Sequence, residues 1–170
     1  AQAWLHLGSG TSEAGVEVAE RAIAMAEAIG ARSDLPRLTE VAGLCELYRD
    51  YERAMSLLDR SLALALEHEQ MTRAGNTYAN LGSIYIDFHK FGEAESIQEH
   101  GLAFARVHEL KSVYAFIEGW QALLLMHLGQ WAAADETIAL ALERAAPSPG
   151  RGSALLALGR LRTRRGDGDA

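Results

Sequence analysis

The sequence has few of the features that mark secreted, disulfide-bonded or membrane-spanning proteins. Its one cysteine, Cys45, cannot form an internal disulfide. The longest uncharged apolar run, from Ala122 to Leu125 and on to Leu128, is far shorter than the roughly 20 residues of a membrane span. The first residues also lack the charged and apolar segments of a signal peptide. We therefore expect a cytoplasmic protein that does not enter a membrane, with Cys45 as a small core residue.

Lysine is rare as well, with two Lys beside fourteen Arg, a bias that favours a bacterial source. The formal charge is -7, and five Arg and two Asp in residues 151–170 leave -10 on residues 1–150. An acidic surface repels the phosphates of nucleic acid. We expect no direct nucleic-acid binding by this chain.

Alanine and leucine are abundant instead, with 30 Ala and 24 Leu beside three Pro in 170 residues. Apolar residues make up 49% and charged residues 23%, which excludes disordered and collagen-like classes. The length is that of one domain. We expect a single all-α domain over residues 1–170 and, because the chain lacks an initiator Met, a piece of a longer multidomain protein.

A repeat of 40 residues organises the sequence. Residues 51–69 and 91–109 share seven of nineteen positions, where composition alone gives roughly two. The matched pairs are Ala54/Ala94, Ser56/Ser96, Leu62/Leu102, Ala63/Ala103, Ala65/Ala105, His68/His108 and Glu69/Glu109. Within the repeat, apolar residues recur at helical spacing, and one helix pair cannot bury its apolar face alone. The sequence therefore predicts a stacked α-solenoid.

Breaks in the pattern predict helices near 1–7, 13–29, 36–48, 52–68, 71–88, 92–107, 111–128, 131–145 and 150–164. Gly30 is placed to end one helix and Pro36 to begin the next, while Ser148 is placed to cap the helix that starts at Pro149. Short connections require antiparallel neighbours. We expect four helix pairs and a terminal helix, with Leu62, Leu102 and Leu142 in equivalent buried positions.

Residues 78–105 resemble a tetratricopeptide repeat. Tyr78, Leu81, Gly82, Tyr85 and Ala94 fall on the family's aromatic, Leu, Gly, Tyr and small-residue positions. Gly101 replaces the usual second Ala, and the period is longer than the typical 34. The resemblance implies a right-handed α–α superhelix in which the first helices of each pair line a concave groove.

Residues 60–87, 91–106 and 153–167 together resemble the tetratricopeptide-like region of large bacterial LuxR-type and AAA-type ATP-binding transcription regulators. The resemblance implies a binding, scaffolding and regulatory segment. It also implies that the nucleotide-binding module lies outside this chain.

Motifs for catalysis, metals or cofactors fail on chemistry. Gly10 and Gly15 have the spacing of a phosphate-binding loop, but Val16 stands where its Lys is required, so Thr11 or Ser12 is expected to cap a helix. None of the six histidines pairs at i, i+4, and His68 and His108 fall at equivalent helix ends, where a cation is favoured. No Ser–His–Asp set stands out. We expect no enzyme, no metal and no cofactor.

The register of the first helices predicts the groove. Its expected binding residues are Glu40, Glu46, Asn76, Asn80, Ser83, Asp87, Phe116, Trp120 and His127. The favoured ligand is a protein, a peptide or another domain of the same chain; the alternative is a small effector in a pocket near Trp120. A carboxylate clamp is not expected, because only Asn80 matches its three donors. Trp120 should be partly exposed, whereas Tyr51, Phe91 and Trp131 should pack between helices.

The last predicted helix combines an apolar run with four arginines. Leu155, Leu158 and Leu161 are spaced to line the inward face, with Arg160 and Arg164 elsewhere on the helix. The resemblance places a further helix after it. We expect an uncovered apolar strip on this helix that drives self-association.

Overall fold

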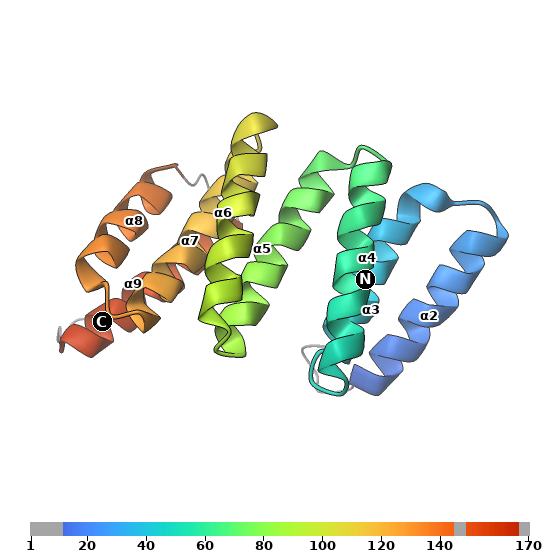
Figure 1. Cartoon of the computed structure of the whole chain (residues 1–170), viewed down its shortest axis with the longest axis horizontal. Helices are drawn as coiled ribbons and strands as arrows, with labels where there is room; N and C mark the ends of the chain where they lie inside the picture. Colours follow the sequence, from blue (N-terminus) through green and yellow to red (C-terminus); the bar gives the residue numbers. More distant parts are fainter. Residues whose placement is uncertain (1–11, 145–148, 167–170) are drawn as a thin grey trace. The chain divides into compact units, whose positions relative to one another are not determined.

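The computed structural model of the protein describes residues 12–144 and 149–166. Within these ranges the chain forms eight α-helices and one short 3-10 helix, without a strand (Figure 1). The predicted all-α, helix-on-helix fold is therefore confirmed. The predicted helix at 1–7 and the predicted cap Ser148 lie outside the described residues. Among the described helices, none combines the length and apolarity that a membrane span requires.

The helix boundaries agree with the predicted ranges to within two residues. The elements are α2 Ser12–Ala28, η1 Arg32–Asp34, α3 Leu35–Glu46, α4 Tyr51–Glu67, α5 Met71–Asp87, α6 Phe91–Val107, α7 Lys111–His127, α8 Trp131–Arg144 and α9 Pro149–Arg165. Two predicted end signals are confirmed. Gly30 follows α2 with a φ of 72°, and Pro36 lies in the first turn of α3.

The links after α4, α5, α6 and α7 share one geometry. Each of these helices has 17 residues and is followed by a link of three, so successive helices begin 20 residues apart. The middle link residue has a positive φ in every case: Glu69 at 54°, His89 at 58°, Glu109 at 56° and Gly129 at 75°. After α4, Glu69 N–H donates to the Leu66 carbonyl at 3.1 Å and Gln70 N–H to that of Ala65 at 2.8 Å. This Schellman-type ending reverses the chain and sets neighbouring helices antiparallel.

The chain divides into two compact units, residues 1–77 and 78–170, where the sequence predicted one domain. The boundary lies inside α5. In unit 1, α3 packs against both α2 and α4. A core of Val16, Ala19, Val41, Ala42 and Cys45 holds α2 against α3. Cys45 is a buried core residue, as predicted, and burial raises the pKa of its thiol, with Glu46 adding to the effect.

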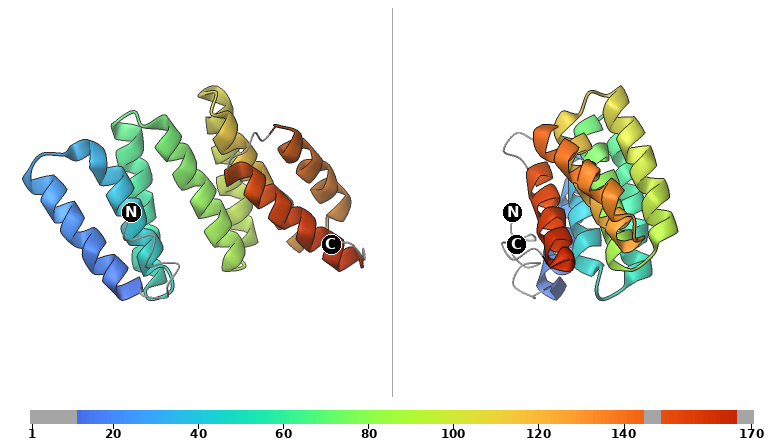
Figure 2. Two further views of the ribbon diagram at one scale, coloured as in Figure 1. Left: turned by 180° about the vertical axis from the view of Figure 1, so that it is seen from behind. Right: turned by 90° about the vertical axis from the view of Figure 1, so that its left-hand side faces the viewer.

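In unit 2, α7 is the central helix and packs against α6, α8 and α9. Figure 1 shows α6 and α8 in front of α7, and Figure 2 (left) shows α9 on the opposite side. Thus α6 and α8 form one layer of this unit, and α7 and α9 belong to the other. Ala122, Leu123, Met126, Ala134, Ile138, Ala157 and Leu161 form the core where α7, α8 and α9 meet.

The 40-residue period recurs in the core. Ala54, Ala94 and Ala134 are completely buried, and Leu58, Gln98 and Ile138 are at most 1% exposed. The three predicted leucines, Leu62, Leu102 and Leu142, are equivalent to one another but half-buried. Their predicted equivalence is confirmed. Their predicted burial was wrong, because the innermost stripe of α4 runs through Ala54, Leu58, Ser61 and Ala65, beside Leu62 and not through it.

Candidate functional site

The nine predicted groove residues are divided between the two units. Unit 1 holds Glu40, Glu46 and Asn76, and unit 2 holds the other six. Each set is therefore described within its own unit.

The two glutamates in unit 1 are not surface groups. Both are 5% exposed. Glu40 accepts a hydrogen bond from Thr77 Oγ1 at 3.2 Å and lies 3.9 Å from the Arg73 guanidinium. Glu46 pairs with Arg49 at 3.2 Å and with Arg53 at 3.4 Å. The expectation that they line an open groove was wrong, because ion pairs and a hydrogen bond to neighbouring side chains hold both carboxylates inside unit 1. Asn76 is exposed on α5.

The polar residues on the unit 2 part of α5 are more accessible. Asn80 and Ser83 are half-buried and Asp87 is exposed. Ser83 Oγ donates to the Asn80 carbonyl at 2.8 Å, so its hydroxyl proton already has an acceptor. Among the predicted groove residues on this part of α5, Asp87 is thus the one that is both charged and exposed.

Phe116 and Trp120 form an aromatic pair one turn apart on α7. Their ring centroids are 6.3 Å apart and the rings are inclined at 68°. Both side chains are half-buried, so Trp120 is partly exposed as predicted. Its buried part packs against Leu124 and Ile86 in one cluster and against Ala122 and Leu123 in another. Trp120 therefore contributes to packing while it also presents an aromatic surface.

His127 marks the end of α7 and lies among groups from three elements. It stacks on Phe91 with centroids 5.3 Å apart and lies 6.2 Å from His89. Burial lowers the pKa of His127, and the neighbouring Arg164, His89 and Arg160 lower it further, while Asp87 acts in the opposite direction. A neutral imidazole is thus favoured between the acidic end of α5 and the basic side of α9.

Asp87, Arg160 and Arg164 lie near His127 in unit 2, and together with the other predicted groove residues of this unit they make up what we call the α5–α7–α9 face. Its members are Asn80, Ser83 and Asp87 on α5, Phe116, Trp120 and His127 on α7, and Arg160 and Arg164 on α9. Its exposed carboxylate stands on α5 and its two arginines on α9, while the aromatic pair stands on α7. In the described part of the chain, His, Cys, Asp and Glu side chains form no group of three or more that could hold a metal ion.

The exposed side of α9 carries apolar groups, but not the predicted ones. Leu161 is buried and Leu158 half-buried, whereas Leu155 is 48% and Leu156 43% exposed. The prediction that Leu155 faces inward was wrong, because Ser153, Ala154, Ala157 and Leu161 form the buried stripe. Small residues occupy most of this buried stripe because α9 crosses close to α7. At the crossing, Ser153 Oγ donates to the Phe116 carbonyl at 3.2 Å. Leu155, Leu156, Gly159, Arg160, Thr163 and Arg164 line a depression of about 570 Å³.

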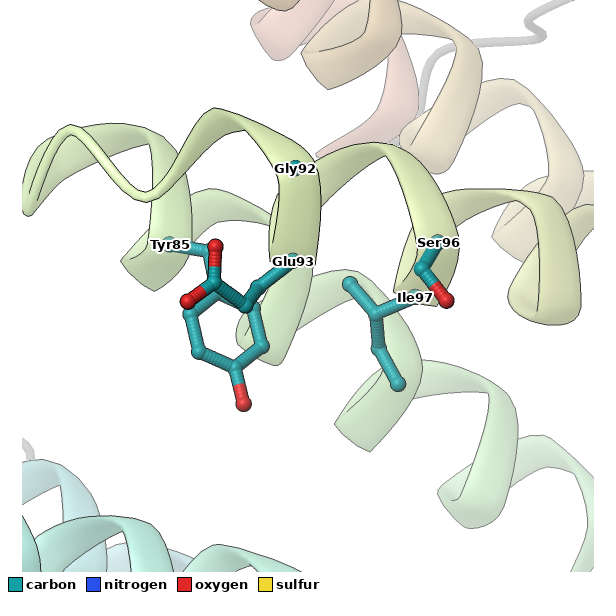
Figure 3. A pocket seen from close by; sticks show the side chains of 5 residues that line it. All are labelled: Tyr85, Gly92, Glu93, Ser96 and Ile97. Atoms are coloured by element: carbon teal, nitrogen blue, oxygen red, sulfur yellow. The ribbon is translucent and has the colours of Figure 1, made fainter.

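A smaller depression of about 420 Å³ lies along α6 (Figure 3). It is lined by Tyr85 of α5 and by Gly92, Glu93, Ser96 and Ile97 of α6. Figure 3 shows the Tyr85 ring, the Glu93 carboxylate and the Ile97 side chain directed to the same side. The lining offers one carboxylate and one phenol without a cation.

A third depression, of about 750 Å³, lies where α6 ends and α7 begins, and it was not predicted from the sequence. Its lining residues are Ala105, Arg106, Glu109, Lys111, Tyr114 and Arg144. They come from α6, α7, α8 and the link between α6 and α7, and none falls in the predicted groove register. The sequence feature that could have indicated this depression is Lys111, one of two lysines in the chain, at the first position of a helix.

Arg144 in this depression also reaches a buried acid. Glu118 is 5% exposed and accepts a hydrogen bond from Arg144 Nη1 through Oε1. Its Oε2 is buried and has no hydrogen-bond partner among the described residues. Burial raises the pKa of Glu118, and the charge and hydrogen bond of Arg144 act in the opposite direction.

Comparison with known proteins gives no relative that could assign a role to these surfaces. No model of a known protein family matches the chain, and no curated protein matches it. The class of protein that the fold defines is an all-α protein built from sequentially packed helices.

Proposed function

We propose that this chain is a non-catalytic binding and scaffolding segment that holds a protein or peptide on the α5–α7–α9 face. The observations that carry the proposal are the half-exposed pair Phe116 and Trp120 on α7, and the Asp87 carboxylate and Arg160 guanidinium near His127 at the end of the same helix. Aromatic anchors with a polar rim are typical of protein-binding surfaces.

The same face supports a preference for extended or helical peptides over compact ligands. It is built from α7 and α9, which lie in one layer of unit 2, and from the end of α5, and its charges of opposite sign stand on different helices. A ligand that uses both must therefore span the face, with a cationic group near Asp87 and an anionic group near Arg160.

We further propose, from the sequence resemblance, that the segment belongs to a bacterial ATP-binding transcription regulator. Occupancy of the face would then bias an inactive against an active arrangement of the longer chain. The sequence of the complete gene tests this point. It should encode a phosphate-binding loop and a helix-turn-helix outside these 170 residues, and a complete gene without either would overturn the assignment.

The binding proposal is tested by selecting peptides from a random displayed library on the immobilised chain and titrating them calorimetrically. Trp120→Ala should weaken a selected peptide by at least about tenfold, as expected for an anchor residue. The matched control is Trp131→Ala on α8, because Trp131 is also a partly exposed tryptophan, 40% exposed, outside the face. Equal weakening in both variants would contradict the proposal.

Because Trp120 also packs in the core, a second variant keeps the test independent of folding. Asp87→Lys with Arg160→Glu reverses two exposed charges on the face, and Glu95→Lys on α6 is the charge control. Selected peptides should lose affinity to the first variant only. A library that yields no binding peptide, while small effectors bind near Trp120, would favour the effector-sensor alternative.

A further inference from the structure

The basic depression at the junction of α6, α7 and α8 lies wholly in unit 2 and apart from the α5–α7–α9 face. Its volume of about 750 Å³ is within the usual range of small-molecule sites. The last turn of α6 supplies Arg106, the start of α7 supplies Lys111 and Tyr114, and the last turn of α8 supplies Arg144. We call it the basic pocket.

The pocket carries excess positive charge in an acidic chain. Three cationic side chains and one carboxylate, Glu109, line it, whereas the whole chain has a formal charge of -7. Neither Arg106 nor Lys111 forms an ion pair with a carboxylate within residues 12–144 and 149–166. Two of the three cations thus have no carboxylate partner among the described residues, and the third, Arg144, gives one nitrogen, Nη1, to Glu118.

Both guanidinium groups are already held in place. The Arg106 carbon Cζ lies 5.8 Å from the centroid of the Tyr114 ring, and its Nη2 donates to Tyr114 Oη at 3.2 Å. The Arg144 Cζ lies 5.6 Å from the same centroid, and Arg144 also pairs with Glu118. Cation–π and hydrogen-bond contacts restrict these long side chains, so a ligand pays less of their ordering entropy.

Lys111 is placed against the preference of its own helix. It is the first residue of α7, where the helix dipole is positive, and the first turn of α7 contains no acidic residue. Arg106 and Arg144 lie in last turns, which favour cations. The lysine at this position therefore costs stability, and a bound anion would remove that cost.

We propose that the basic pocket binds a small soluble molecule through a phosphate or pyrophosphate group, with the phosphoryl oxygens held by Arg106, Lys111 and Arg144. Guanidinium groups match phosphate oxygens in pairs, and the lysine adds a mobile point charge. Tyr114 positions both arginines. This site is a second one, independent of the peptide surface, so either proposal can fail without the other.

The test is a calorimetric titration of the chain with sodium pyrophosphate at low ionic strength, with citrate at matched ionic strength as the carboxylate probe. Pyrophosphate should bind and citrate should bind at least about tenfold more weakly. Arg106→Gln with Lys111→Gln should reduce pyrophosphate affinity by at least about tenfold. Arg144 is left unchanged, because its removal would strand the buried Glu118 carboxylate.

The control double variant is Arg37→Gln with Arg162→Gln, which changes the net charge equally at two exposed positions outside the pocket. It should retain the affinity of the unaltered chain. If the Arg106 and Lys111 double variant loses helical circular dichroism, Lys111→Gln alone is titrated, and it too should bind more weakly. Absence of pyrophosphate binding, equal binding of citrate, or equal loss in the control would overturn the proposal.

Discussion

Gly82 on α5 lies directly against Gln98 on α6. A Cβ atom at Gly82 would be 2.9 Å from Gln98 Cγ, so only glycine fits without displacing that side chain. Gly43 has the same relation to Leu58, whose Cγ would be 3.0 Å from a Cβ at Gly43. The two helix pairs thus share one packing device, a glycine on the first helix that admits a large side chain from the second.

Gln98 is the unusual member of this repeated pair. It is 1% exposed, and neither its Oε1 nor its Nε2 has a hydrogen-bond partner among the described residues. Replacement by the residue of the preceding repeat, Gln98→Leu, should stabilise the protein by about 1–3 kcal/mol, because a buried unsatisfied amide is removed. The free energy of unfolding in urea measures it, with Leu58→Gln expected to destabilise. A Gln98→Leu variant less stable than the unaltered chain would reveal a hidden partner for the amide.

Where α7 and α9 cross, two glycines should respond oppositely when they are replaced by alanine, one variant losing stability and the other gaining it. A Cβ at Gly119 would overlap Ser153 Oγ and lie 2.7 Å from the Ala154 nitrogen, whereas one at Gly159 would meet no heavy atom within 4 Å. Gly119→Ala should therefore destabilise by about 1–3 kcal/mol through overpacking. Gly159→Ala should stabilise by about 0.5–1 kcal/mol through helix propensity. Thermal unfolding of both variants checks this, and a stabilising Gly119→Ala would contradict the close crossing.

The repeated link geometry predicts how the middle residues respond to substitution. Glu69 has a φ of 54°, a conformation that costs an L-residue with a side chain about 1 kcal/mol. Glu69→Gly should consequently stabilise by up to about 1 kcal/mol, and Gly129→Ala should destabilise by a similar amount. Chemical denaturation measures the free energy of unfolding of both variants. A destabilising Glu69→Gly together with a stabilising Gly129→Ala would mean that these links do not share one backbone conformation.

Glu118 should make stability depend on pH. Burial raises its pKa above the ordinary 4.5, so the folded state holds the proton more tightly than the unfolded state. Its favourable contribution is complete below pH 4.5 and is lost as the pH rises through the raised pKa. The stability of the Glu118→Gln variant relative to the unaltered chain should therefore increase as the pH rises through the raised pKa of Glu118. Unfolding free energies across the pH range test it, with the exposed Glu95→Gln as control; a relative stability that falls with pH would contradict the assignment.

The helices and their order could be predicted from the sequence because the 40-residue period and the end signals at Gly30 and Pro36 are local. The residues of the innermost core stripe could not be predicted, since the polar Ser61 is buried while its apolar neighbour Leu62, one position further around the helix, is only half-buried. Leu155 was misplaced for a similar reason: the close approach of α9 to Gly119 favours Ala154 and Ala157 on the inward side.

The candidate surfaces were predicted in part. The register placed Trp120 correctly as partly exposed, because its position follows from the repeat. Glu40 and Glu46 were predicted to line the groove, yet both are buried, with their charges compensated inside unit 1 by Arg73, Arg49 and Arg53. The basic pocket was missed because Arg106 and Arg144 are 38 residues apart and only the packing of α6, α7 and α8 brings them to Tyr114.

The account depends most on the claim that a peptide occupies the α5–α7–α9 face. The most direct measurement is the change in backbone amide chemical shifts when a library-selected peptide is added to the isotopically labelled chain. The account predicts that the largest changes fall at Ser83, Trp120, His127 and Arg160. Changes concentrated on α6 and α8, around Glu95 and Trp131, would contradict it.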